Sequence, residues 1–350
     1  MTSVDGILSE LSNDNQSLNS TTHSDSPSKS VVLDHYYSLL GTTSIPVSAF
    51  IKNADSRYIS LANLHLGPVS STHIITALQS SHHLTSLNLY NNSFGTQGLK
   101  ALSNLLNTSQ TLQSLNIGRN CLRYALGPFL SSSLSNLLNS EDDDVCFDLE
   151  CFASSNLIDL DVSGNELGDF CFKILADSLL KSKKIKKLSV RDNKLGSKSI
   201  NVLIALINDL ELEFLDVSNN CLVNSSNFES FLECLRSSSL KSLKLGSIGL
   251  IDSNIDDLVS CLDSMKLETI DISENSLSFN GLLKFSHLLR SGEIKYFDMS
   301  KILIGSDELF SFLNELLPNS TLTLNIHRCY RTLSLNLENL IKNYRKRLLI

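Results

Sequence analysis

A short pattern of apolar residues and asparagine recurs along this chain and constrains its fold more than any other feature. The pattern has apolar residues at its first, fourth, sixth and eleventh positions and asparagine at its ninth. Six full copies begin at Leu84, Leu112, Leu157, Ile185, Leu212 and Leu267. Recurrence of this kind is far beyond chance and is typical of a repeat protein, in which each unit packs only against its neighbours.

The spacing between copies gives the length of the repeating unit. Neighbouring copies start 27 or 28 residues apart, and weaker copies around Leu61, Leu245, Met299 and Ile326 extend the array to about ten units. One interval is longer, because 45 residues separate Leu112 from Leu157. The surplus is polar and includes four consecutive acidic residues, 141–144, which predicts a surface loop inserted near 131–153.

Each unit combines the periods of a strand and a helix. The alternation Leu87-Asn88-Leu89 is typical of a strand with one buried face, and the asparagine that follows can satisfy backbone groups in a turn. Apolar residues then recur at helical spacing, as in Phe172, Leu175 and Leu179. Because a helix is wider than a strand, the stacked units predict an α/β solenoid, a horseshoe with parallel inner strands and outer helices.

The repeats resemble the ribonuclease-inhibitor-like class of leucine-rich repeat proteins. The resemblance covers about residues 55–330 and is carried by the unit length and by segments such as LTSLNLYNNSFGTQGLKALSNLL and LIDLDVSGNELGDFCFKILADSLL. The class includes inhibitors, innate-immune sensors, actin-regulating proteins and the GTPase-activating protein for Ran. The resemblance therefore implies recognition of other proteins, by analogy with the class.

Composition outside the repeats predicts the remaining segments. Residues 1–30 are rich in Ser, Asn and Thr and predict a disordered tail. Residues 31–54 predict an N-terminal capping segment, because the end units of a stack need a different outer face. Residues 55–330 form the array, and 331–350 predict a C-terminal capping helix with a basic end.

The residues between the apolar strand positions are expected to point to the concave face. Three features of this face are the candidates for partner binding, because aromatic and Arg side chains anchor protein interfaces and a row of carboxylates favours a basic partner segment. The alternative is that the polar residues only keep the strand surface soluble. The candidates are the carboxylates Asp159, Asp161, Asp216, Asp271 and Asp298, the arginines Arg119 and Arg191, and the aromatics Tyr90, Phe214 and Tyr296.

No motif indicates chemistry. The eight histidines do not share a column, and no phosphate-binding loop or metal-ligand spacing occurs, so we expect no catalytic residues, cofactor or metal. The net charge of −8 argues against nucleic acid as a partner, and no apolar run is long enough to cross a membrane. We expect a monomer.

The sequence thus predicts a protein-interaction scaffold or regulator rather than an enzyme. The alternative is a GTPase-activating protein for a small GTPase of the Ran type, which needs only a surface that orders the partner's catalytic groups. The polar, acidic start lacks the features of a secretion signal, and the cysteines of the helical segments look like small apolar residues. Both features predict a cytoplasmic location, with the nucleus as the alternative.

Overall fold

The computed structural model describes residues 30–40, 46–122, 151–223, 227–318 and 321–350. The chain divides into two units, Met1–Ser30 and Val31–Ile350, and the second contains all the elements described here. The predicted disordered tail at 1–30 lies outside the described residues except for Ser30, and so does the predicted insertion as far as residue 150.

Within Val31–Ile350 the strands form one parallel sheet of eleven strands, in which every strand pairs with the next one along the chain. This order confirms the predicted α/β leucine-rich repeat solenoid of about ten units. The strands are β1 (Tyr58–Ser60), β2 (Ser86–Asn88), β3 (Ser114–Asn116), β4 (Asp159–Asp161), β5 (Lys187–Ser189), β6 (Phe214–Asp216), β7 (Ser242–Lys244), β8 (Thr269–Asp271), β9 (Tyr296–Asp298), β10 (Thr323–Asn325) and β11 (Leu348–Leu349).

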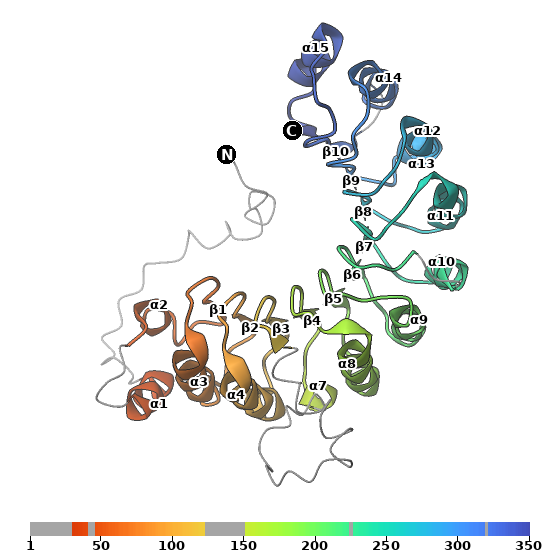
Figure 1. Cartoon of the computed structure of the whole chain (residues 1–350). Coiled ribbons are helices and arrows are strands. Elements are labelled where there is room, and N and C mark those ends of the chain that lie inside the picture. The colour runs from red at the N-terminus through yellow and green to blue at the C-terminus, as the bar shows by residue number, and fades with distance from the viewer. Residues whose placement is uncertain (1–29, 41–45, 123–150, 224–226, 319–320) are drawn as a thin grey trace, which may run out of the picture. The chain divides into compact units, whose positions relative to one another are not determined.

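Helices follow the strands and cover one face of this sheet, so its other face is open (Figure 1). We call the open face the inner face. Among the described residues, the helices between β1 and β10 are α3 (Gly67–Leu78), α4 (Gly95–Thr108), α7 (Cys151–Ser154), α8 (Gly168–Ser182), α9 (Ser199–Asp209), α10 (Phe228–Arg236), α11 (Ile255–Leu262), α12 (Phe279–Leu283), α13 (Ser286–Arg290) and α14 (Ser306–Leu316), with a short 3-10 helix at Asp252–Asn254.

The apolar positions of the pattern form the core between strands and helices. The middle residue of each strand, such as Leu87, Leu160 or Ile270, is buried, and its two neighbours in the strand are mostly half-buried. Since successive side chains of a strand point to opposite faces, the middle residues face the helices and their neighbours face the inner side. Helix residues such as Leu175 and Phe231 close the core from the other side.

The pattern asparagines join neighbouring units through their side chains. The backbone N–H of Asn92 donates to Oδ1 of Asn120 at 2.9 Å, and the N–H of Asn120 donates to Oδ1 of Asn165 at 2.8 Å. The same contact continues at 3.1 Å to Asn193 and at 3.1 Å to Asn220. Each side-chain amide also donates to backbone carbonyls, so the ladder satisfies polar groups that would otherwise be buried without a partner.

Different elements close the two ends of the repeat array. At the N-terminal end, α1 (Val31–Leu39) and α2 (Ser48–Ile51) pack together through buried Tyr36 and Phe50, whose ring centroids lie 4.8 Å apart. At the C-terminal end, α15 (Leu335–Asn343) is followed by β11, which pairs in parallel with β10. This last strand was not anticipated from the sequence, because the basic run before it suggested only a solvated helix end.

The described cysteines differ in their exposure. Cys121 and Cys221 follow the turn asparagine, and both are exposed. The five other described cysteines are buried. The small residue at the turn therefore points outward, because the asparagine before it already fills the interior.

Candidate functional site

Strand pairing places the predicted concave-face residues in columns across the sheet. Each strand pairs in register with the next, so residues of the same pattern position lie side by side over eight strands. The first column is Ser86, Ser114, Asp159, Lys187, Phe214, Ser242, Thr269 and Tyr296. The second column is Asn88, Asn116, Asp161, Ser189, Asp216, Lys244, Asp271 and Asp298.

All four carboxylates of the second column form hydrogen bonds that stabilise the local backbone. In Asp161, Asp216, Asp271 and Asp298, Oδ1 accepts the backbone N–H two residues later, at 2.8 to 2.9 Å. Asn88 and Asn116 make the same contact with their side-chain oxygens. This is an Asx turn, which ends each strand before the asparagine turn. The row of acidic residues is therefore explained first by local backbone structure.

Burial limits the carboxylates further. Asp216 and Asp271 are only 6% and 8% exposed, so a partner has little access to them. Burial raises the pKa of Asp271, and the nearby Asp298 carboxylate adds to this rise, while Lys244 opposes it. Burial also raises the pKa of half-buried Asp159, against the attraction of Lys187.

The two half-buried carboxylates of the second column already have side-chain partners. Oδ2 of Asp161 accepts a hydrogen bond from the Asn116 amide at 2.9 Å. Oδ2 of Asp298 accepts from the Asn325 amide at 2.7 Å and from the Tyr296 hydroxyl at 3.2 Å. Both oxygens of each carboxylate are thus engaged within the sheet. Burial and the carboxylate of Asp298 raise the pKa of Tyr296.

The other two candidate aromatics are half-buried and each lies beside a cation. The guanidinium carbon of Arg119 lies 5.9 Å from the centroid of the Tyr90 ring. The Lys244 ammonium lies 5.4 Å from the centroid of the Phe214 ring. Such contacts hold an aromatic face and a cation together while both keep some contact with water. They form two aromatic and cationic positions on the inner face.

Backbone geometry directs Arg119 to the edge of the inner face. Its φ of 52° is in the left-handed region, like that of the residue before the turn asparagine in several other units. Its side chain crosses the next unit at Gly164, where an added Cβ would lie 2.7 Å from the Arg119 Cγ. Arg119 is exposed and Arg191, two units on, is half-buried. Within the described residues neither arginine forms an ion pair.

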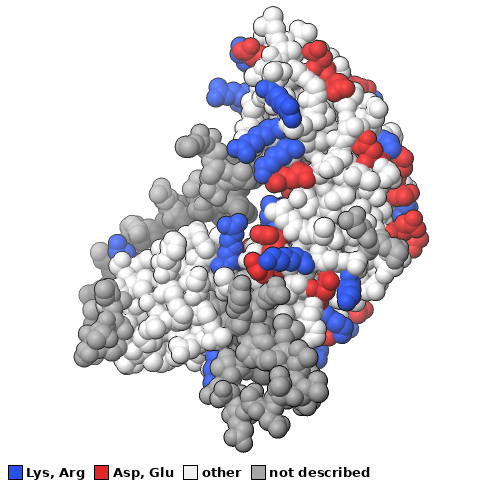
Figure 2. Space-filling model, in the orientation of Figure 1, with Lys and Arg blue, Asp and Glu red and all other residues white. Residues whose placement is uncertain are grey.

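The structure adds Lys187 and Lys244 to the candidates, since both face the inner side. Lys187 lies between Asp159 and Phe214, and Lys244 lies between Asp216 and Asp271. The sequence spacing already places both lysines on the inner face, but it does not show which side chains lie beside them in the folded sheet. Charge also varies along the array: Lys100 is the only charged residue in 58–118, whereas charges of both signs are frequent later. In Figure 2 the surface over β1–β3 is accordingly almost uniformly uncharged.

In the described part of the chain, no helix has the length and apolar content that a membrane span requires. A search of the same residues for three or more His, Cys, Asp or Glu side chains arranged around one point finds none.

The sequence comparisons agree with the repeat architecture. A family model described as Leucine Rich repeat matches residues 80–103 and 153–169. The chain is 30% identical over 231 residues to NACHT, LRR and PYD domains-containing protein 5 of Mus musculus, which covers 64% of this chain and 18% of that protein. It is 35% identical over 121 residues to NACHT, LRR and PYD domains-containing protein 3 of Homo sapiens, covering 34% of this chain and 10% of that protein.

A solved structure titled Leiomodin-1 Actin-Binding Site 2 (ABS2) aligns with 43% of this chain and 88% of that chain, with 16% identity and a TM-score of 0.35. For the two NACHT, LRR and PYD domains-containing proteins, the segments that align with this chain span less than a fifth of each protein's length. The recurring pattern, the parallel sheet and the family match together show that this chain has the fold of a leucine-rich repeat solenoid.

Proposed function

We propose that this protein is a scaffold or regulator of the ribonuclease-inhibitor-like class that binds a partner protein through its inner face. The observation that carries the proposal is the pair of aromatic and cationic positions, Tyr90 with Arg119 and Phe214 with Lys244, on the face that the helices leave open. Aromatic and Arg side chains supply most of the binding energy of protein interfaces. The family match and the LRR-containing relatives support an interaction role.

The charges of the inner face suggest what the partner presents. Arg119 and Arg191 have no carboxylate partner within the described residues, so they favour acidic side chains near β3–β5. A basic partner segment, as the sequence suggested, would contact half-buried Asp159, because Asp216 and Asp271 are buried. Both carboxylate oxygens of Asp161 and Asp298 are already engaged within the sheet. We therefore propose a partner segment of mixed charge, bound by a monomer in the cytoplasm or nucleus.

A combined variant tests this proposal. Tyr90→Ala, Arg119→Ala, Arg191→Ala and Phe214→Ala together should abolish capture of partners in proximity labelling, because each truncation removes an interface anchor. The matched control carries Phe170→Ala, Lys173→Ala and Lys342→Ala, which lie on the outer helices α8 and α15. Urea unfolding should show both variants folded. Equal labelling by the combined variant and the native protein would contradict binding through this face.

GTPase activation remains the second candidate because exposed Arg119 could stabilise charge in a partner's transition state. Single-turnover GTP hydrolysis by a panel of small GTPases, with and without the protein, distinguishes it from simple binding. Acceleration that is lost in Arg119→Ala would support activation. Unchanged hydrolysis across the panel would leave the scaffold role.

A further inference from the structure

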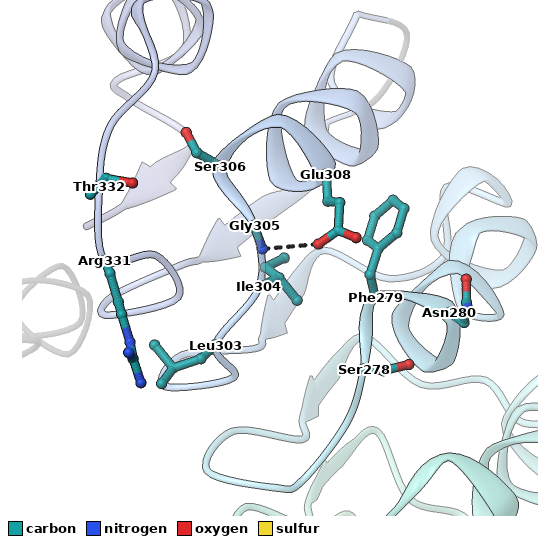
Figure 3. A pocket seen from close by; sticks show the side chains of 10 residues that line it. All are labelled: Ser278, Phe279, Asn280, Leu303, Ile304, Gly305, Ser306, Glu308, Arg331 and Thr332. Atoms are coloured by element: carbon teal, nitrogen blue, oxygen red, sulfur yellow. Dashed lines mark hydrogen bonds between the residues drawn. The ribbon is translucent and has the colours of Figure 1, made fainter.

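A hollow of about 580 Å³ opens at the edge of the array, where the chain passes from β8, β9 and β10 into the following helices. Figure 3 shows Phe279 on one side of it, Leu303 and Ile304 at its base, and Arg331 on the opposite side. Because it lies on the loops that lead into the helices, this edge hollow is distinct from the inner-face columns.

The hollow exists because the last unit departs from the repeat pattern. Strand register aligns Leu324 with Phe297, which places Arg331 opposite Ile304, at the eleventh pattern position. In the units from Phe94 to Leu277 this position is apolar and at most 6% exposed, whereas Arg331 is exposed. Without an apolar neighbour to cover it, Ile304 stays half-buried. The substitution thus leaves an open apolar surface in place of a sealed core.

Leucines around the hollow are unusually open to water. Leu303 is 54% exposed, and Leu333 and Leu335, which follow Arg331, are 52% and 72% exposed. The N–H of Ser334 donates to Oγ of Ser306 at 2.8 Å, so this segment lies against the start of α14 beside the hollow. Several large apolar side chains exposed at one place, with polar residues around them, are typical of an interaction site.

The charges around the hollow are unequal. Arg331 forms no ion pair within the described residues, whereas Lys301 nearby is already paired with Glu274 at 2.7 Å. Arg328, at the turn before Arg331, is also exposed. On the other side, Oε2 of Glu308 accepts the Gly305 N–H at 2.9 Å, which holds its carboxylate at the start of α14. The unpaired charge of the hollow is therefore positive and lies on the Arg331 side.

We propose that the edge hollow is a second docking site, which binds an extended acidic and apolar segment of a partner protein. An apolar side chain of that segment packs between Phe279 and Leu303, and an adjacent Asp or Glu pairs with Arg331. The acidic residue lies on the Arg331 side because Glu308 would repel it at the other end. The paired guanidinium and carboxylate give direction to contacts that the apolar surface alone would not orient.

Selection from a phage-displayed library of random linear peptides, on the immobilised full chain, tests this proposal. Enrichment of Asp or Glu next to Leu, Ile or Phe is the expected result. Enriched peptides that are basic, or that bind equally well to Arg331→Glu, would overturn it. A library with no enrichment over an uncoated surface would also overturn it. Self-association of the chain that depends on concentration and is removed by Arg331→Glu would overturn it too, because a second copy of the chain would then occupy the hollow.

A synthetic peptide from the selection then allows the contacts to be separated. Arg331→Glu should weaken its binding at least about tenfold, the cost of replacing a charge-assisted pair with repulsion. Leu303→Ser should weaken binding several-fold, whereas Arg345→Glu, the same charge change at an exposed site on the turn before β11, should leave it unchanged. If Arg331→Glu and Arg345→Glu lowered the affinity for the peptide equally, the effect would come from the overall charge of the protein, and the proposal would be contradicted.

Two further variants test whether a loss of peptide binding comes from misfolding or from the inner face rather than from the edge hollow. Arg331→Leu restores the apolar pattern position, so it should cover Ile304, raise stability and still lose the peptide. Loss of binding in this more stable variant cannot be attributed to misfolding, and retained binding would contradict the role of Arg331. Tyr90→Ala with Phe214→Ala should leave peptide binding intact, because these residues lie on the inner face.

Discussion

The first and second halves of the array differ in the side chain that fills the turn at the ninth pattern position. From Asn92 to Asn220 the side-chain ladder is continuous across five units. Beyond it the same pattern position is Ile248, then Asn275, then Ile302, and the ladder is interrupted. Ile248 and Ile302 are each only 1% exposed, so apolar burial replaces the hydrogen bonds there. The comparison shows that the repeat needs a filled turn, which either side chain can provide when its surroundings match.

Charge also changes along the array, but it does not change at the boundary between the two halves. The inner column begins with the neutral Asn88 and Asn116 and later carries Asp216 and Asp271. Both amide and carboxylate oxygens close the Asx turn. The column from β6 to β8 therefore carries buried negative charge that the turn itself does not require, with Lys244 between the two carboxylates across the sheet.

The largest effect is expected from breaking the continuous ladder. Asn120→Leu removes the acceptor of the Asn92 N–H and the donors to the carbonyls of Leu89 and Ile117. Buried groups left without partners cost about 1–3 kcal/mol each, so the free energy of unfolding should fall by roughly 3 kcal/mol or more. Urea unfolding measures it.

The interrupted half provides the control for this prediction. Ile302→Leu keeps an apolar residue at the same pattern position and should cost no more than about 1.5 kcal/mol. If Asn120→Leu were as mild as Ile302→Leu, the ladder would be dispensable and the contrast between the halves would disappear.

A smaller effect, dependent on pH, is expected at Asp271. Its pKa in the folded protein is raised by burial and by Asp298, so the folded state binds this proton more tightly than the unfolded state does. The resulting stabilisation is complete below the ordinary Asp value of 3.8 and is lost as pH rises through the folded pKa. Asp271→Asn keeps the oxygen that closes the turn and removes this loss. At neutral pH it should be more stable than the native protein.

Urea unfolding at several pH values tests the sign. The advantage of Asp271→Asn should shrink as pH falls, whereas Asp192→Asn, at an exposed left-handed position, should show little difference in either direction. An advantage of Asp271→Asn that grows toward acid pH would mean that the carboxylate is stabilised in the folded protein.

The smallest effect is expected from the exposed charges of the second half. The Lys301 ammonium pairs with Glu274 at 2.7 Å, and both side chains are more than a third exposed to water. Lys301→Ala should therefore lower stability by only about 0.5 kcal/mol at low salt, and the difference should vanish near 1 M salt, where screening acts within about 3 Å. Unfolding at two salt concentrations measures it. A loss that persists in high salt would indicate packing by the lysine stem instead.

Much of this architecture could be predicted from the spacing of leucines and asparagines. Leu87, Leu160 and Ile270 face the core as expected, and the inner columns lie in the predicted register. Such features depend on local periodicity, which repeats in every unit. The ladder, too, follows from the recurrence of asparagine at one position, since stacked units bring equal positions together.

The candidate site was only partly predictable. Asp216 and Asp271 occupy the expected column, yet their burial depends on residues a whole unit away. Tyr296 was a candidate partner contact, but it lies half-buried and its hydroxyl is bonded to Asp298. The edge hollow was missed because it depends on a break in the pattern at Arg331, which draws attention only once the last strands are aligned.

Sequence by itself determined the repeating unit, the direction of the strands within the repeats and the order of the columns, because these depend on contacts within one period. Only the tertiary structure decided which side chains of the inner face are accessible to a partner and where the edge hollow forms. The physical reason is that neighbours across the strands decide how exposed a side chain is and whether its charge is paired. Those neighbours lie 27 or 28 residues away along most of the chain, so the residue's own type does not reveal them.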